Sequence, residues 1–241
     1  MTAGESEASV ARSARDRRGG LGRSAASFRC PRCRADGELA NAAGGARCSR
    51  CSAVFPLLDE AVPVLVHDPA AAANAYGAMF GSNAEQYDER FHVDPEHGRW
   101  VLRRMREIRP ELWDGQGGHV LEIGAGSGHL TRALESGELW RFDELTVTDL
   151  SGEMLVANHR RSARPDDVRF WACNVRELPF ADGAIDAVFG FDILHHVFDY
   201  RSALRELARV VRPGGFVAVK EPHRGAYRLF SFLSRMIFLR A

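Results

Sequence analysis

Short apolar runs alternate with longer amphipathic segments from His119 to the end of the chain. Helices are predicted to begin near Gly128, Ser151 and Tyr200, and the predicted strands read HVLEI, LTVTDL, VRFWACN, IDAVFGFDIL and GGFVAVKEP. Continuous apolar strands separated by helices are typical of a parallel sheet that is covered on both faces. The pattern therefore predicts an α/β fold with a doubly wound, mainly parallel sheet over residues 119–241.

The first 118 residues predict three further segments. Residues 1–27 contain almost no large apolar side chains and cannot offset the entropy cost of ordering, so a disordered tail is expected. Residues 28–67 combine short turns with four cysteines, and residues 68–118 indicate a helical linker and lid. Within this linker, PEHGRWVLRRMREI is predicted to place these apolar side chains on roughly one helix face: Trp100, Val101, Met105 and Ile108.

Composition narrows the classes of function. The chain has 32 basic and 32 acidic residues, and this zero net charge does not favour a nucleic acid or an anionic membrane as partner. No stretch approaches the roughly 20 apolar residues of a membrane span, and no apolar secretory segment follows the N-terminal charges, so a cytoplasmic protein is expected. Lys220 is the only lysine, which excludes a Walker A loop and disfavours Schiff-base chemistry, since this residue ends a predicted strand.

Four of the five cysteines form two CxxC pairs, which are Cys30 with Cys33 and Cys48 with Cys51. Each pair suits a tight turn, and two such turns complete a tetrahedral Zn²⁺ site. Four thiolates leave no open coordination position, so the predicted ion is structural. Its binding would stabilise a segment that is too small to fold on apolar burial alone. Two disulfides and a thioredoxin-type redox pair are the alternatives, and the fifth cysteine, Cys173, is predicted to be a small buried strand residue.

Residues 28–66 resemble the small zinc-ribbon proteins through the segments FRCPRC, ARCSRC and AVFPLLDEAVPVLV. That family includes free-standing activators of RNA methyltransferases, and fused forms precede methyltransferase domains. The resemblance implies a zinc ribbon over residues 28–67.

The segment HVLEIGAGSGHL, residues 119–130, places three glycines at alternating positions after an apolar run. A dinucleotide fingerprint that began at Gly124 would need glycine at position 129, where the chain has His129. Glu122 lies two residues before the first glycine, and a carboxylate there would repel phosphate and attract a cation. S-adenosylmethionine fits this pattern because it carries a sulfonium and an ammonium but no phosphate.

Two polar residues follow the next predicted strands. Asp149 lies 21 residues after Gly128, where the carboxyl ends of adjacent parallel strands meet a ligand, and it could accept both ribose hydroxyls. Alternatively Asp149 caps the following helix, a task that Ser151 could perform instead. Asn174 follows VRFWAC and could pair with an adenine edge, although an asparagine after a strand is usually a turn residue.

From about Asn83 to Pro222 the chain resembles the class I S-adenosylmethionine-dependent methyltransferases, in the group that contains quinone and small-molecule enzymes. The matching segments are VLEIGAGSGHLT, VTDLSGEML, NVRELPFADGAIDAVFGFDILHHV and ALRELARVVRPGGFVAVKEP. The resemblance implies a Rossmann-like sheet of strand order 3-2-1-4-5. Glu122 and Asn174 stand where aspartate is commoner in that family.

By that resemblance, Glu122 orients the methionine end of the cofactor, Asp149 holds the ribose, and Asn174 with Val175 holds the adenine. The full set of implied cofactor residues is Glu122, Gly124, Ala125, Gly126, Gly128, Asp149, Leu150, Asn174, Val175 and Phe191. Tyr87 would belong to a helical lid, or would simply be a core or surface tyrosine.

Methyl transfer needs alignment, exclusion of water and, for some acceptors, one proton acceptor. His195 and His196 follow the fourth predicted strand, and either could take a proton from an oxygen or nitrogen nucleophile. The alternative for both histidines is packing or hydrogen bonding within the loop. Asp192 and His223 are weaker candidates for the same role.

The last segment, AYRLFSFLSRMIFLRA, is apolar nearly all round and predicts a buried helix. By resemblance two more strands would follow it and close the sheet, and they are missing from the sequence. An uncovered fifth strand invites pairing, so either self-association through this edge and helix or an incomplete catalytic domain is expected.

The sequence thus predicts S-adenosylmethionine-dependent methyl transfer to a small-molecule acceptor. An RNA-base methyltransferase is the first alternative, because some enzymes that modify ribosomal RNA carry an N-terminal zinc ribbon. A non-catalytic module, in which the ribbon is the working part, is the second.

Overall fold

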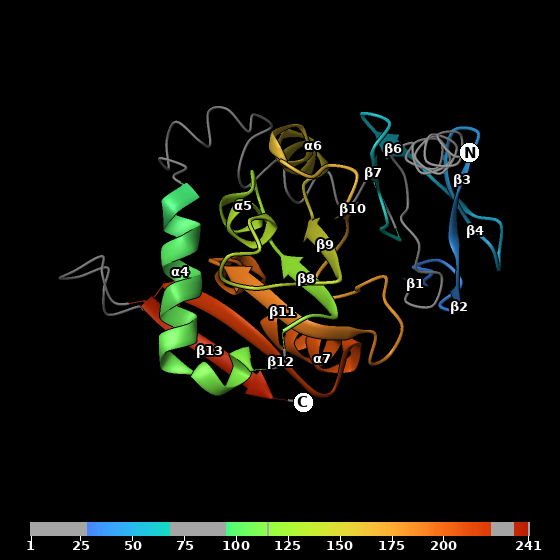
Figure 1. Cartoon of the computed structure of the whole chain (residues 1–241). Helices are drawn as coiled ribbons and strands as arrows, with labels where there is room; N and C mark the ends of the chain where they lie inside the picture. The colour runs from blue at the N-terminus through green and yellow to red at the C-terminus, as the bar shows by residue number, and fades with distance from the viewer. Residues whose placement is uncertain (1–27, 68–94, 115, 223–233, 241) are drawn as a thin grey trace, which may run out of the picture.

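The computed structural model describes residues 28–67, 95–114, 116–222 and 234–240 (Figure 1). The predictions for the tail of residues 1–27, for Tyr87 in the lid and for His223 lie outside the described residues. The helices are α4 (Pro95–Ile108), α5 (His129–Glu135), α6 (Gly152–Arg161) and α7 (Tyr200–Val210). The strands from β8 onward are β8 (His119–Ile123), β9 (Glu144–Asp149), β10 (Val168–Ala172), β11 (Ile185–Phe191), β12 (Val211–Pro222) and β13 (Ser234–Arg240).

One sheet forms the centre of the molecule, with the strand order β10-β9-β8-β11-β12-β13. The first five strands are parallel and follow the predicted order 3-2-1-4-5, so the predicted doubly wound fold is confirmed. Glu122 of β8 lies between Val147 of β9 and Phe189 of β11 in the register. The glycine turn therefore leaves the sheet at its middle, between the carboxyl ends of β9 and β11.

The two faces of the sheet carry different layers, as Figure 1 shows. Val120 packs in a core with residues of α4, α5 and α6, whereas Leu121 and Ile123 pack in a second core with residues of α7. Successive strand side chains point to opposite faces, so a continuous apolar strand such as β8 serves both cores.

Helix α4 covers the first face with a different set of side chains from the set predicted. Val101 and Met105 are fully buried as expected, and Leu102 is buried beside them. Trp100 and Ile108, however, are 43% and 47% exposed. The close approach of Gly98 to the backbone of His129 fixes the helix rotation, because a Cβ at Gly98 would lie 2.2 Å from the His129 carbonyl oxygen.

The C-terminal prediction is wrong over residues 234–240, which form a strand and not a helix. Strand β13 runs antiparallel to β12, with Phe216 opposite Arg240 and Pro222 opposite Ser234. The fifth strand therefore has a partner on its outer side, and the uncovered edge on which self-association was predicted does not exist there. The backbone groups of an apolar segment can form their hydrogen bonds either within a helix or with the open edge of a sheet. Here the edge of β12 is open, so residues 234–240 pair with it as a strand.

Residues 28–67 form a four-cysteine module of short antiparallel strands. These are β1 (Phe28–Arg29), β2 (Asp36–Gly37), β3 (Leu39–Ala42), β4 (Gly45–Cys48), β5 (Val54–Phe55), β6 (Leu57–Leu58) and β7 (Val62–Pro63). The module lies against β10: the Leu65 N–H donates to the Ala172 carbonyl at 2.7 Å, and Val64 and Ala172 form a parallel bridge. Phe28, 1% exposed, packs edge-on against Trp171 of the same strand.

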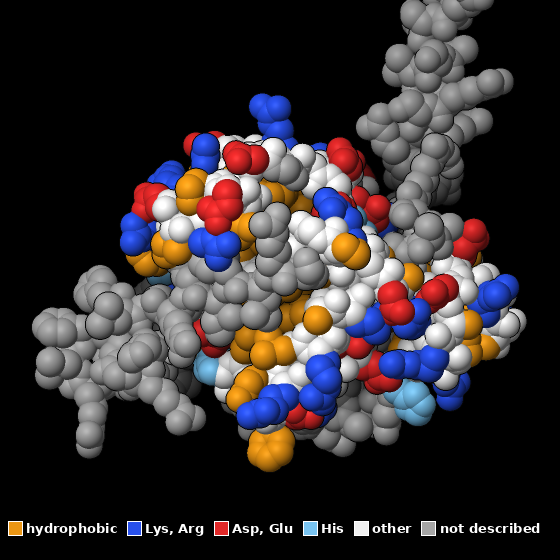
Figure 2. Space-filling model, turned by 90° about the horizontal axis from the view of Figure 1, so that it is seen from below, with side chains coloured by type: hydrophobic (Ala, Val, Ile, Leu, Met, Phe, Trp, Pro, Cys, Tyr) orange, Lys and Arg blue, Asp and Glu red, His pale blue; other side chains and the backbone are white. Residues whose placement is uncertain are grey.

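No helix in the described ranges has the length and apolar character that crossing a membrane requires. Figure 2 shows basic and acidic side chains interspersed over the described part of one face, without a broad area of a single charge. That mixture matches the zero net charge of the chain.

Candidate functional site

The turn after β8 adopts a backbone that suits glycine at all three positions. Gly124, Gly126 and Gly128 have φ angles of +61°, +53° and +103°, a region that other residues rarely adopt. A Cβ at Gly124 would lie 2.5 Å from the Ile193 side chain. A Cβ at Gly126 would meet no described atom within 4 Å, so the turn is open above this glycine and a ligand could approach its backbone.

Glu122 is a buried carboxylic acid directly before this turn. Its side chain faces α5, it is 1% exposed, and its Oε2 accepts a hydrogen bond of 2.7 Å from the Thr131 hydroxyl. Burial raises the pKa of Glu122 to about 8, and the Thr131 hydrogen bond opposes part of that rise. A cation placed beside this carboxyl group would lower its pKa and favour the charged form.

Asp149 ends β9 beside the turn. Its Oδ2 accepts the Gly126 N–H at 2.8 Å and its Oδ1 accepts the Ser151 N–H at 2.9 Å. Burial raises the pKa of Asp149, and these backbone donors oppose the rise. Ser151 caps α6 by accepting the Met154 N–H, so Asp149 does not provide that cap and instead ties the glycine turn to β9.

Asn174 follows β10 and takes part in a local turn. Its Oδ1 accepts the Arg176 N–H at 3.0 Å, which leaves the side-chain NH₂ group to contact a ligand. The neighbouring Cys173 is buried, as predicted, and its N–H donates to the Asp149 carbonyl at 2.8 Å. The predicted ribose and adenine residues therefore lie on adjacent strand ends, with Leu150 and Val175 partly exposed beside them.

The ends of β11 and β12 add a charged pair. Lys220 Nζ lies 2.8 Å from both carboxylate oxygens of Asp192, and 4.6 Å from the centre of the Phe191 ring. The centre of the His97 ring of α4 lies 5.1 Å from the centre of the Phe191 ring. Phe191, which the resemblance implies as a cofactor residue, lies at the carboxyl end of β11.

Glu221 organises the loop that carries both candidate histidines. Its Oε1 accepts the N–H groups of Ile193 and Leu194 at 3.0 and 2.7 Å, and its Oε2 lies 2.8 Å from His195 Nδ1. If Nδ1 carries the proton that it donates to Glu221, Nε2 is left as a proton acceptor. The His195 side chain is 34% exposed, so an acceptor molecule can reach it.

His196 lies against His195, with ring centres 3.7 Å apart. Burial lowers the pKa of His196, as does the nearby charge of His195. His196 is therefore biased towards the neutral form, whereas the His195 ring contacts the Glu221 carboxylate.

Sequence reasoning missed Glu221, Thr131 and Asn158, and it considered Lys220 only as a Schiff-base residue. The adjacent charges in VAVKEP offered a signal, because charged residues at the end of a continuous apolar strand need partners or a function. Thr131 and Asn158 gave none, since each lies within an ordinary amphipathic helix.

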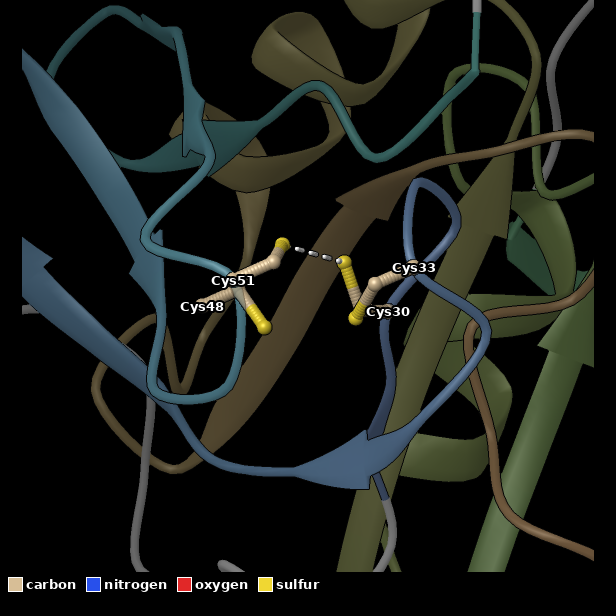
Figure 3. A group of neighbouring side chains, drawn as sticks. All are labelled: Cys30, Cys33, Cys48 and Cys51. Carbon is tan, nitrogen blue, oxygen red and sulfur yellow. Dashed lines mark hydrogen bonds between the residues drawn. The ribbon is translucent and has the colours of Figure 1, made fainter.

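The four cysteines meet between two loops of the module, and Figure 3 shows their sulfur atoms turned towards one another. All four Sγ atoms lie within 4.8 Å of one another, and Cys30 and Cys51 are separated by 3.7 Å. Four thiolates about 2.3 Å from a Zn²⁺ ion would be about 3.8 Å apart along each edge of the tetrahedron. The Arg50 N–H donates to Cys48 Sγ at 3.3 Å.

Comparisons with known proteins agree with this geometry. Residues 121–219 match the family model described as methyltransferase domain. The chain is 36% identical over 136 residues to a demethylmenaquinone methyltransferase of Mycobacterium marinum, covering 56% of this chain and 55% of that protein. It is 29% identical over 119 residues to the O-methyltransferase rstn1 of Aspergillus nomiae, covering 49% and 53% respectively.

Among solved structures, phosphoethanolamine N-methyltransferase 1 of Haemonchus contortus, in complex with phosphoethanolamine and S-adenosylhomocysteine, shares the fold. The TM-score is 0.50 at 17% identity, and the match covers 65% of this chain and 34% of that one. The chain spans about half the length of the curated relatives named above. Over residues 121–219 the chain is therefore similar to the methyltransferase-domain family, and its fold is the Rossmann-like fold of the solved structure named above.

Proposed function

We propose that this domain binds S-adenosyl-L-methionine above the glycine turn and transfers its methyl group to a small-molecule acceptor. The observation that carries the proposal is the buried Glu122 carboxyl group beside a turn that is open at Gly126. A buried carboxylate without a cation is costly, and a phosphate placed there would make the cost greater. A ligand with positive charge and no phosphate relieves both problems.

The described residues suit the parts of this cofactor. Glu122 would meet the charged methionine end, Asp149 the ribose hydroxyls, and Asn174 with Val175 the adenine. Ala125, Leu150 and Phe191 would line the path between them. When bound, the cofactor supplies a methyl group made electrophilic by positive sulfur, and the protein supplies alignment and exclusion of water.

His195 is the group that we assign as general base. Its Nε2 would accept the proton of an acceptor hydroxyl when that oxygen takes the methyl group from the sulfur of a bound cofactor. Glu221 holds the ring through Nδ1 and stabilises the imidazolium that results. The proton would then pass from His195 to solvent.

The names of the relatives support a small-molecule acceptor, since one is an O-methyltransferase and another acts on demethylmenaquinone by its name. We also propose that Cys30, Cys33, Cys48 and Cys51 hold a structural Zn²⁺ ion. The support is the spacing of the four sulfur atoms, together with the small size of the module.

Calorimetry with S-adenosyl-L-methionine, NAD and ATP tests the cofactor proposal, and only the first is expected to bind. Transfer of a labelled methyl group to a panel of quinols, phenols, sugars and RNA then identifies the acceptor class. A folded, zinc-loaded protein that does not bind S-adenosyl-L-methionine would refute the proposal.

His195→Gln tests the assigned base. We expect kcat to fall by about 10²- to 10⁴-fold with the Kd for the cofactor unchanged. Glu221→Gln should lower kcat less and change its pH profile, because the ring loses its carboxylate partner. The exposed His67→Gln is the control, and a variant of His195 with full activity would remove it from the mechanism.

A further inference from the structure

A row of buried polar side chains runs from α6 through α5 to the carboxyl group of Glu122. Asn158 of α6 and Thr131 of α5 are both fully buried. Asn158 Nδ2 donates to Thr131 Oγ1 at 2.9 Å, and Thr131 Oγ1 donates to Glu122 Oε2 at 2.7 Å. Two helices are thereby joined to the strand that leads into the cofactor turn.

We propose that Thr131 and Asn158 are positioning residues for the cofactor: they orient the Glu122 carboxylate and stabilise its charged form. A threonine hydroxyl has one proton to donate. Because Thr131 accepts the amide hydrogen of Asn158, its own proton is directed to Glu122. The hydrogen bond occupies Oε2, so Oε1 is the oxygen that a bound cation would meet. This inference rests on the proposed cofactor, although its central measurement does not.

We call the hydrogen-bonded chain Asn158–Thr131–Glu122 the relay. Gly128 connects this relay to the glycine turn. A Cβ at position 128 would lie 2.2 Å from Asn158 Oδ1. The third glycine is therefore needed for space as well as for its φ of +103°, since Asn158 could not approach Thr131 past a larger residue. The turn and the relay are parts of one packed unit.

The charged groups around Glu122 are Glu135 and Arg132 of α5 and Asp149 of β9. The negative charges of Glu135 and Asp149 raise the pKa of Glu122, and the positive charge of Arg132 lowers it. Within the described residues, Thr131 is the one side chain that hydrogen-bonds the Glu122 carboxyl group. Its removal should therefore have a separate and measurable effect.

Thr131→Val keeps the shape of the side chain and removes the hydroxyl. By carboxyl NMR titration of the unliganded protein, we expect the pKa of Glu122 to rise by about one unit. The Kd for S-adenosyl-L-methionine at pH 7 should rise about tenfold, and the difference should shrink as the pH exceeds the new pKa. Thr131→Ser should restore both values.

Thr148→Val is the matched control, because Thr148 is buried and donates to the backbone carbonyl of Glu122 at 2.7 Å. It should cost similar stability and leave the Glu122 pKa in place. Asn158→Ala should shift the pKa in the same direction as Thr131→Val, and the double variant should equal Thr131→Val alone, since the two act in series.

An unchanged Glu122 pKa in Thr131→Val, or an equal shift in Thr148→Val, would overturn the relay. Failure of the wild-type protein to bind S-adenosyl-L-methionine would instead refute the proposed function, and the NMR titration would still decide the relay.

Discussion

Glu122 shows at the scale of one residue how burial can prepare a site for a cation. Water is excluded from its carboxyl group, Thr131 supplies one hydrogen bond, and burial raises its pKa to about 8 from 4.5. Between these two values the folded chain holds a proton that the unfolded chain has lost. Stability should therefore fall as the pH rises through this window, and a bound cation should reverse that loss.

A pH-dependent calorimetric experiment tests this behaviour. At pH 7 we expect the binding of S-adenosyl-L-methionine to release up to one proton, seen as a dependence of the binding enthalpy on the buffer's ionisation enthalpy. Affinity should increase from pH 6 towards pH 8. Glu122→Gln should bind more weakly and release no proton from this position. Equal proton release by the two proteins would show that another group is responsible.

The sequence predicted the residues whose positions follow from the strands themselves. Glu122, the three glycines and Asp149 were predicted because each lies at or directly after the carboxyl end of an apolar strand, where ligands bind in this fold. Glu221 and Thr131 act through contacts between elements. Those contacts depend on how a loop folds back and on how a helix is rotated against the sheet, which spacing along the chain does not reveal.

At the scale of elements, the four-cysteine module contacts both sides of Asn174, the predicted adenine residue. It packs on strand β10, which precedes Asn174, and on the loop of residues 175–180, which follows it. The Arg29 N–H donates to the Pro179 carbonyl at 3.0 Å, and Phe28 forms an antiparallel bridge with Phe180. Arg34 pairs with Glu177 within the loop itself. Order in residues 174–180 therefore depends on the module that packs on them.

Removal of the proposed zinc tests this dependence. In the chelated protein we expect faster amide hydrogen exchange in residues 168–180 together with residues 28–66, because a module without its metal unfolds locally. Exchange in α7 should change little. Readdition of Zn²⁺ should restore the protection. Chelation that leaves residues 168–180 unaffected would separate the module from the loop.

Strand β13 shows where pattern reasoning fails for an element. An apolar run of this length suits a helix as well as a buried strand, and periodicity alone does not separate the two. The backbone of β12 offers unpaired groups, and pairing along residues 216–222 satisfies them. The parallel strands β8 to β12 were predictable because each is a short apolar run bounded by turns, loops or amphipathic helices.

At the scale of the whole molecule, the module and the Rossmann-like domain share one core. Phe28, Cys30 and Phe55 of the module belong to the same buried cluster as Trp171 and Phe180. The Trp171 and Phe180 rings stack with centres 5.1 Å apart. A continuous core of this kind predicts that the two parts unfold together.

Phe28→Ala tests this cooperativity. Loss of a fully buried phenylalanine typically costs about 3–5 kcal/mol, and we expect one calorimetric transition that moves to lower temperature as a whole. Val54→Ala changes an apolar residue of the same module that is 41% exposed, and it should have little effect. Two separate transitions in the wild-type protein would contradict a shared core.

The open space above Gly126 allows a substitution that should block cofactor binding without unfolding the domain. An alanine at that position collides with no described atom, so the methyl group would project where the donor is proposed to sit, at the modest backbone cost of a positive φ. Such a protein would keep its fold and its acceptor surface while remaining unable to turn over. This variant could then bind the acceptor from cell extracts and retain it, whereas the active protein would methylate and release the same compound.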